Sequence, residues 1–441
     1  MAATGRDGEV RIHGAAVSAD GVLRPLTARD GRLGEEPGYV ASTWSQSLGK
    51  ILRDAQRHDG GEGIDAVVFD VTEVLTQRDE RPIVIRIAPR APVDDAHALR
   101  SAFGAAAPAM VIDLPGGHTT LGQELVELKT VSLRRMLPTI GPGRSYVITA
   151  VGALADPSHE NRVADLLYEI ASPSSVEVSH QFYGTAFDMR ERTSLHNLAL
   201  RDGAENLSVA LGLALEELLP NATPFVTQND GGVVPLARLS SGPVHSLYAD
   251  AAIAMIGAAA LARVLEGDVI ACVNGEVRRA MIVSGVPTAA SFGEKFEGVR
   301  LATQTARLVP FHADAGDAAG FRADALVRDV EGRVEVEHAG VGDSAEVDAF
   351  AGDLVAIGAA CAPLAAWENR IITIRDAGDS RGALSDAEAQ VKGELLAYGA
   401  VPETIRILES RVVTTAYENS RIASVRVRGI AVTSPEIRTI A

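Results

Sequence analysis

Two polar segments have residue types and a spacing that could serve catalysis. In the sequence PGGHTT, two glycines precede His118, so a turn could present the imidazole at a cleft. Further along, Glu191 and Arg192 open a helical region and could supply a carboxylate and a guanidinium to the cleft. These three residues are the candidate catalytic side chains. The alternatives are an ordinary loop whose glycines serve its geometry, and a capped helix start that faces solvent.

A third segment could bind an anion. Ser240, Ser241 and Gly242 precede Pro243, and hydroxyl groups beside an open helix N-terminus can hold phosphate oxygens. The alternative is a helix-entry turn capped by serine. Asp230, which precedes two glycines, is expected to lie in a hairpin turn.

Several familiar motifs are absent from the sequence. It has no G-x-x-x-x-G-K-[ST] phosphate loop, no His-Glu-x-x-His zinc helix and no G-x-S-x-G nucleophile turn. No group of His, Asp and Glu has metal-site spacing, so no metal held by protein ligands is predicted. Cys272 and Cys361 are too few for a disulfide framework. Cys272, in an alternating strand pattern, is expected to be buried and unreactive.

The elements that must position these residues alternate between strand and helix, which predicts an α/β fold. Apolar runs such as 82–89 and 144–152 are typical of buried strands, and Asp156-Pro157 is expected to open a helix. The alternation restarts at Ser175, which predicts a boundary near residue 172, with an N-terminal lobe at 1–172 and a C-terminal lobe at 173–441.

The predicted C-terminal lobe contains further element signals. The region Leu195–Leu219 has helical character, with a break expected at Asp202-Gly203. Residues 175–182 predict one strand, and Asn274-Gly275 predicts the turn of a hairpin.

Composition excludes several function classes. The 441 residues carry a net charge of −17, which repels phosphate backbones and argues against a nucleic-acid partner. The N-terminal sequence lacks the apolar core of a signal peptide. No uncharged apolar run approaches the roughly 20 residues of a membrane span, so a cytoplasmic protein without a membrane partner is expected.

Several segments together resemble the A subunit of the hydantoinase/oxoprolinase family. They are IDLPGGHTTLGQELVEL, YVITAVGALADPSHENRVADLLYEI, QFYGTAFDMRERTSLHNLAL, VTQNDGGVVPLARLSSGPVHSLYADAAIAMIGAAALA and VKGELLAYGAVPETIRILESRVVTTAYE. They follow one another in the family's order along most of the chain.

The resemblance implies an actin-like/sugar-kinase-like architecture, with two ribonuclease-H-like lobes around a cleft that holds ATP and Mg²⁺. Members open hydantoins, 5-oxoproline or other cyclic amides, and some carboxylate ketones. A B-type subunit usually completes the enzyme, so either that subunit or an intact A-type subunit is the expected partner, beside a small-molecule substrate.

The nucleotide loops depart from the family pattern. Active members have Asp-x-Gly-Gly-Thr in both lobes, whereas Ile12–Val17 has no Asp, glycine pair or Thr. At the second position, Ile270–Glu276, only Gly275 remains, and a thinned adenosine loop would include Gly316. The resemblance therefore implies a degenerate ATP site.

Three functions remain open. The chain is a subunit of an ATP-dependent cyclic-amide hydrolase, a non-catalytic scaffold or regulatory subunit of a related carboxylase or hydrolase, or a small-molecule binding protein that needs no nucleotide. The first is preferred.

Overall fold

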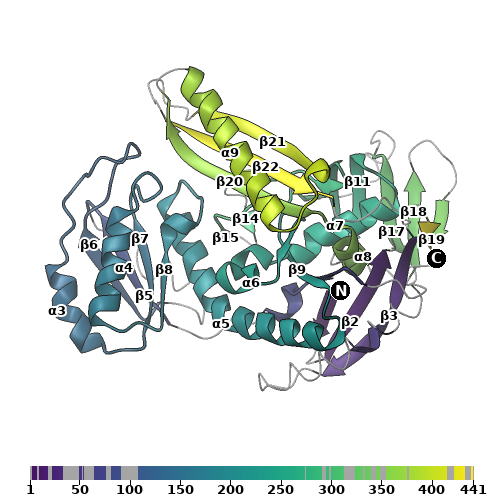
Figure 1. The fold of residues 1–441 in the computed structure, drawn as a ribbon, viewed down its shortest axis with the longest axis horizontal. Coiled ribbons are helices and arrows are strands. Elements are labelled where there is room, and N and C mark those ends of the chain that lie inside the picture. Colours follow the sequence, from purple (N-terminus) through teal and green to yellow (C-terminus); the bar gives the residue numbers. More distant parts are fainter. Residues whose placement is uncertain are drawn as a thin grey trace.

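The structure is a computed structural model of the whole chain (Figure 1). The residues it describes are 2–6, 9–17, 22–32, 49–51, 53, 64–75, 81–90, 108–273, 275–290, 295–296, 299–311, 323–330, 333–338, 344–347, 354–374, 377–414, 422–432 and 439–440.

A four-stranded parallel sheet forms one end of the molecule (Figure 1). Its order is β6-β5-β7-β8, with the bounds β5 (Ile83–Ala88), β6 (Met110–Pro115), β7 (Ser145–Ala150) and β8 (Ser175–Val178). The strands β5 and β7 are buried throughout, because helices cover both faces of the sheet.

Helices α3 (Val131–Ile140) and α4 (Ser158–Ile170) cover one face, where Ile85 and Val163 belong to the same core. The first part of α5 (Phe187–Leu218) covers the other face, where Leu195 packs with the alternate β-strand residues Val84 and Val147. The predicted helix after Asp156-Pro157 is thus confirmed.

The predicted boundary at residue 172 falls inside this sheet. Strands β7 and β8 lie on either side of it and pair in parallel, from Ser145 with Ser175 to Ile148 with Val178. A division at 172 therefore passes through hydrogen-bonded strands. The alternation of elements could not reveal this, because it does not say which strands pair.

A six-stranded sheet occupies the centre, in the order β21-β22-β20-β10-β9-β4. The bounds are β4 (Ala66–Phe69), β9 (Thr223–Thr227), β10 (Val233–Pro235), β20 (Leu364–Thr373), β21 (Ile405–Thr414) and β22 (Ile422–Ala431). Helix α9 (Ala377–Ala397) packs on β20–β22 through Val391 and Leu395 (Figure 1).

The third sheet has the order β13-β12-β11-β17-β18-β19, with β16 beside β12. Its strands are β11 (Glu266–Val273), β12 (Glu276–Val283), β13 (Val286–Pro287), β16 (Val309–Pro310), β17 (Ala325–Val330), β18 (Arg333–His338) and β19 (Ser344–Val347). The β11–β12 register pairs Val273 with Glu276, so the hairpin predicted at Asn274-Gly275 is confirmed.

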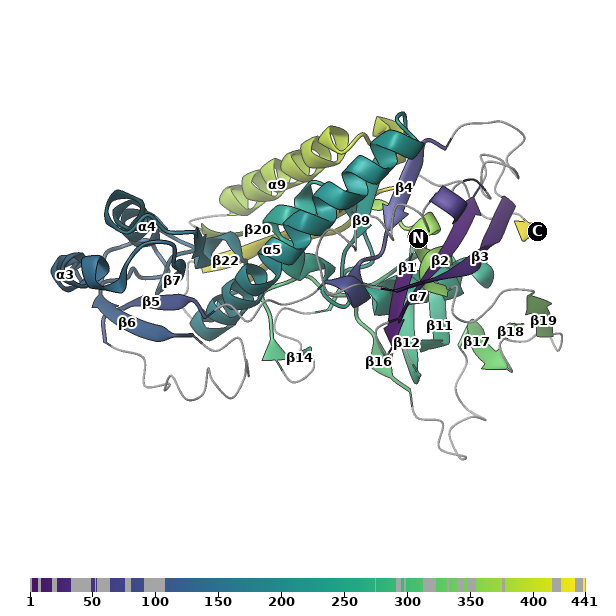
Figure 2. The same ribbon diagram turned by 90° about the horizontal axis from the view of Figure 1, so that it is seen from below.

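A sheet of N-terminal strands lies beside these elements and includes the C-terminal strand (Figure 2). Its order is β1-β2-β3-β23, with β1 (Ala2–Arg6), β2 (Glu9–Val17), β3 (Val22–Arg32) and β23 (Thr439–Ile440). The short strands β14 (Lys295–Phe296) and β15 (Val299–Arg300) form a separate pair.

Helix α5 (Phe187–Leu218) is 32 residues long and runs between the parallel sheet and the central sheet (Figures 1 and 2). The break expected at Asp202-Gly203 is absent. Buried side chains on both sides of that point, such as Leu200 and Leu207, hold the helix against two cores, which outweighs the local cost of a glycine.

Helices α7 (Ala249–Leu261) and α8 (Leu354–Cys361) cross at glycine. A methyl group on Gly257 would lie 2.1 Å from the backbone oxygen of Leu354, and one on Gly358 would lie 1.8 Å from that of Ile253. The two backbones touch here, which no larger residue allows.

Two predictions about strand residues fail in part. Cys272 is only partly buried on β11, because its partner Val277 is itself an exposed residue of the hairpin. The strand expected at 175–182 ends at Val178 and continues as the 3-10 turn η3 (Ser179–Gln181).

Among the described helices, none is long and apolar enough to cross a membrane.

Candidate functional site

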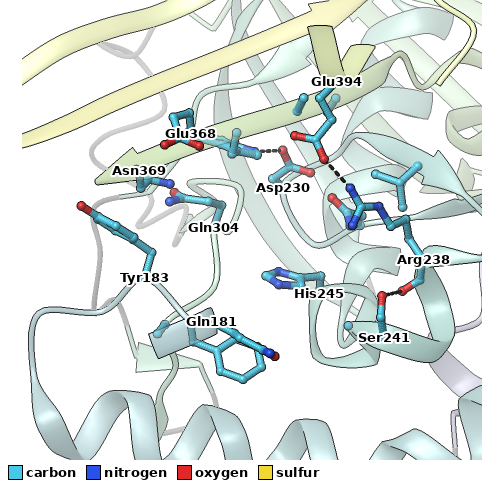
Figure 3. Close-up of a pocket in the computed structure, with 18 of the residues that line it drawn as sticks. Gln181, Tyr183, Asp230, Arg238, Ser241, His245, Gln304, Glu368, Asn369 and Glu394 are labelled. Carbon is cyan, nitrogen blue, oxygen red and sulfur yellow. Dashed lines mark hydrogen bonds and ion pairs between the residues drawn. The ribbon is translucent and has the colours of Figure 1, made fainter. Parts of the chain in front are cut away.

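A cavity of about 460 Å³ lies where β20 meets the β9–β10 turn, η3 and the short helices α6 (Arg238–Ser241) and η4 (Pro243–Ser246) (Figure 3). Its size is typical of small-molecule sites. Polar and aromatic side chains line it. They are Gln181, Phe182, Tyr183, Gln228, Asp230, Arg238, Ser241, His245, Gln304, Trp367, Glu368, Asn369, Glu394 and Tyr398.

The β9–β10 turn forms one wall and is held in place by Asp230. Its Oδ1 accepts a hydrogen bond from the Gly232 backbone N–H at 2.9 Å, and its Oδ2 accepts one from Trp367 Nε1 at 2.6 Å. The Arg428 guanidinium donates to the Asp230 backbone oxygen at 2.9 Å. A Cβ on Gly232 would lie 2.1 Å from Ala365 Cβ, so the close approach to β20 requires glycine. The expected turn is confirmed, and Asp230 braces this wall.

Another part of the cavity wall carries an ion pair. Arg238 Nη2 donates to Glu394 Oε1 at 2.6 Å, and the Tyr398 hydroxyl donates to the same carboxylate. Arg238 also lies over the Tyr398 ring. This pair joins α6 to α9 across the cavity rim.

Two of the three residues predicted to bind an anion line this cavity. Ser241 and Gly242 are lining residues, and Ser240 is not. Both serine hydroxyls donate to backbone carbonyls, those of Ala237 and Arg238. They act as turn hydroxyls here, which fits the alternative interpretation of a helix-entry turn, and anion binding stays a prediction.

His118 lies at the carboxyl edge of the parallel sheet. Its backbone N–H donates to Val151 O at 2.9 Å, and its imidazole Nε2 lies 3.6 Å from Asp156 Oδ2. The ring of His159 is 4.1 Å away, centroid to centroid. His159 Nδ1 accepts the Gly117 N–H, so its proton is on Nε2, which donates to Glu124.

The edge of a parallel sheet where the strand order reverses is a common ligand position. Here β6 follows β5 on one side and β7 lies on the other side of β5. His118 is 4% exposed and does not line the cavity of Figure 3. Its catalytic role stays a prediction. The partner His159 was not predicted, since its spacing from His118 gives no signal.

A buried network fixes the η3 wall of the cavity. Glu160 accepts hydrogen bonds from Ser179 Oγ at 2.6 Å and from both the backbone N–H and the Nδ1 of His180. Arg190 donates to Ala150 O at 2.7 Å and to Gly184 O at 2.9 Å. The segment that contains Gln181–Tyr183 is therefore held from both ends.

The other two candidate catalytic residues lie outside the cavity. Glu191 accepts two hydrogen bonds from Arg86, at 2.7 and 2.8 Å, and both side chains are at least 95% buried. Burial raises the pKa of Glu191, and the Arg86 contacts oppose this shift. Arg192 is 3.8 Å from Asp188 on the same helix. Glu191 joins α5 to β5, and sequence spacing could not reveal this distant partner.

Asp70, which follows β4, is a buried acid that sequence analysis missed. It accepts a hydrogen bond from Thr227 Oγ1 at 2.7 Å and one from the Thr72 N–H at 3.2 Å. Burial raises its pKa to about 6, with a further contribution from Asp250. In the sequence, only the apolar run at 64–71, near whose end it lies, marks this position. Within the described residues, no group of His, Cys, Asp and Glu could hold a metal ion.

No protein-family model matches the chain, and no curated protein matches its sequence. Among solved structures, the ATP-dependent caprolactamase from Pseudomonas jessenii is similar, with a TM-score of 0.68 over 100% of this chain and 88% of its own. A nucleotide-free acetone carboxylase, from work on ATP-dependent acetone carboxylation, has a TM-score of 0.61 over 98% and 87%. Sequence identity is 11% in both cases.

The chain has the fold of these two enzymes. Both are members of the hydantoinase/oxoprolinase-related family, so the resemblance inferred from the sequence is confirmed for the fold. The predicted mixed α/β class is confirmed with it.

The segments that correspond to the family's nucleotide loops lie in two different sheets. Residues Ile12–Val17 lie inside β2 and pair with β3 across an irregularity between Ile12 and Gly14. This segment, which the resemblance places at the first nucleotide loop, is strand. The degenerate ATP site stays a prediction. Gly275 has a φ of +80° and ends the turn before Glu276, as a hairpin loop requires. Gly316 lies outside the described residues.

Proposed function

We propose that the chain is a subunit of an ATP-dependent complex that opens cyclic amides or imides, with a degenerate nucleotide site of its own. The observation that carries this proposal is the fold match over essentially the whole chain to a caprolactamase and an acetone carboxylase, both ATP-dependent. The cavity supports it, because its size and polar lining suit a small organic substrate.

The architecture we propose has two ribonuclease-H-like lobes around a cleft. The β11–β12 hairpin, with β17 parallel to β11, supports this assignment for the second lobe. The hairpin turn would then face the phosphates of a bound nucleotide, where Glu276 would repel them.

Co-purification at native expression tests the subunit role. A tagged chain is expected to bring down a B-type subunit or an intact A-type subunit, identified by mass spectrometry. The purified complex, but not the chain alone, is expected to open lactams or hydantoins only when Mg-ATP is present. A chain that purifies alone at every salt concentration would contradict the proposal.

A non-catalytic scaffold or regulatory subunit is the second candidate. The extended strand at Ile12–Val17, in place of a phosphate loop, favours it. Gln304→Leu in the cavity separates the two roles: a substrate-binding subunit loses turnover in the complex, whereas a scaffold leaves turnover unchanged.

A further inference from the structure

Three polar groups in the cavity have no partner among the described residues. The atoms Gln304 Nε2 and Asn369 Oδ1 are buried and make no hydrogen bond. The carboxylate of Glu368 has no hydrogen-bond donor and no ion pair from the described part of the chain. Figure 3 shows all three on the same side of the cavity.

The orientation of the Gln304 amide is fixed by its neighbour. Arg426 Nη2 lies 2.7 Å from Gln304 Oε1, and a guanidinium can only donate. The amide oxygen must therefore face Arg426, which leaves Nε2 as a donor without a partner. Gln304 is 92% buried, so this donor has no ready access to bulk water, and leaving it unpaired is costly.

The charges that line the cavity do not balance. Its carboxylates are Asp230, Glu368 and Glu394, and Arg238 is its one guanidinium. Arg238 is matched by Glu394, and Asp230 receives Trp367 Nε1 with Arg428 close by.

Glu368 is the acid that remains unmatched. Burial raises its pKa, the nearby Arg370 opposes this shift, and Glu394 adds to it. Arg370 donates its Nη2 to Ala383 O. Burial also lowers the pKa of His245, which keeps that lining residue neutral.

We propose that this cavity binds a small molecule that carries a protonated amine and, at its other end, a carbonyl or carboxylate oxygen. The amine would donate to Glu368 and to Asn369 Oδ1, and the oxygen would accept from Gln304 Nε2. Such a ligand satisfies all three groups and neutralises the unmatched charge. Tyr183 contributes an aromatic surface beside the amine position (Figure 3).

Calorimetric titration of the purified full chain, without nucleotide, tests this assignment. The probes are β-alanine, 4-aminobutyrate and 6-aminohexanoate, each paired with the carboxylate of the same length that lacks the amine. At least one amino acid is expected to bind about tenfold or more tightly than its partner, because a charge-assisted hydrogen bond is lost without the amine.

Substitutions then assign the binding to these side chains. Glu368→Gln and Gln304→Leu are each expected to weaken the best probe by about tenfold. Glu216→Gln removes an exposed carboxylate of α5 that does not line the cavity, and is expected to leave affinity unchanged. Thermal unfolding of each variant checks that its fold is intact.

Two results would overturn the assignment: no amino acid binds better than its amine-free partner, or Glu368→Gln and Glu216→Gln have equal effects. Neither ATP nor a partner subunit enters this experiment. Failure of the proposed complex and failure of this binding site are therefore separate outcomes.

Discussion

At the residue scale, the acids of this protein differ in whether their charge is matched. Glu160 receives four hydrogen bonds and Glu191 receives two from one arginine. Asp70 accepts hydrogen bonds only from neutral donors and lies near Asp250, so burying its ionised form costs free energy. A buried carboxylate thus stabilises the fold where its hydrogen bonds match its charge, as at Glu160 and Glu191, and destabilises the fold at Asp70.

Asp70 should give the stability of the chain a distinctive pH dependence. Its pKa is about 6 in the folded state, above the value of 3.8 expected when unfolded. The folded chain binds the Asp70 proton more tightly than the unfolded chain does, so protonation of Asp70 stabilises the fold. This stabilisation is fully present below about pH 4 and is lost as pH rises through about 6.

Asp70→Asn removes this titration. Relative to the wild type, the variant is expected to gain up to about 3 kcal/mol of unfolding free energy between pH 4 and pH 7. Urea denaturation at a series of pH values measures the difference. A constant difference between the two proteins across that range would show that Asp70 does not titrate there.

The Glu191–Arg86 pair should be structural. Glu191→Gln leaves a buried guanidinium without its charge partner and is expected to cost about 3–5 kcal/mol of stability. Asp188→Asn, which breaks an exposed contact to Arg192 on the same helix, is the matched control and is expected to cost less than about 1 kcal/mol. Equal midpoints for the two variants in urea denaturation would contradict the assignment and restore Glu191 as a catalytic candidate.

At this scale, the sequence predicts the positions of residues but not their partners. It placed His118 in a turn and Asp230 in a hairpin from local glycines, because turn geometry is encoded within a few residues. It could not find His159 beside His118, or Arg86 beside Glu191, because those contacts depend on which strands neighbour each other. The unpaired amide of Gln304 is likewise visible only once Arg426 is placed against it.

At the scale of elements, sequence signals predicted the structure where a few neighbouring residues determine it. They failed where tertiary packing determines the structure. The β11–β12 hairpin follows from Asn274-Gly275, and α4 follows from its Asp-Pro start. The continuity of α5 through Gly203 does not follow from local propensity, because two hydrophobic cores hold that helix.

The crossing of α7 and α8 offers a direct test of close packing. Gly358→Ala would place a methyl group 1.8 Å from the Ile253 backbone oxygen, so the helices must separate. We expect a loss of roughly 1–3 kcal/mol, as in other overpacked cores. Gly393→Ala on α9 is the control, since no atom lies within 4 Å of the added methyl group.

The control substitution should go the other way. Alanine in a helix interior is favoured over glycine by about 1 kcal/mol, so Gly393→Ala is expected to raise the melting temperature slightly. If both variants change stability by the same amount, the helices are not in backbone contact.

At the scale of the whole molecule, order along the chain identified the fold better than any single motif. The matching segments recur in family order, and the fold agrees over nearly the full length at 11% identity. What the sequence could not supply was the pairing between segments. Strand β8 joins the parallel sheet across the expected boundary, and β23 joins the N-terminal strands.

Nucleotide binding is the property in which this chain should depart from enzymes of the same fold. A phosphate site needs glycine amides and hydroxyls that point at the phosphate oxygens, with an acid to orient Mg²⁺. Residues Ile12–Val17 instead pair as a strand. At the second loop position, the β11–β12 hairpin places Glu276 next to Gly275. Each lost hydrogen bond to a charged group costs about 1.5–3 kcal/mol.

We therefore expect the isolated chain to bind Mg-ATP weakly or not at all, because several such losses together lower affinity by orders of magnitude. Calorimetric titration of the purified chain measures this, and a complex that contains an intact A-type subunit serves as the positive control. Glu276→Gln should remove repulsion and yet not restore binding, because the missing donors remain missing. Micromolar affinity of the wild-type chain would mean that its phosphate site is built from other residues, and would make the chain itself the ATP-dependent catalyst.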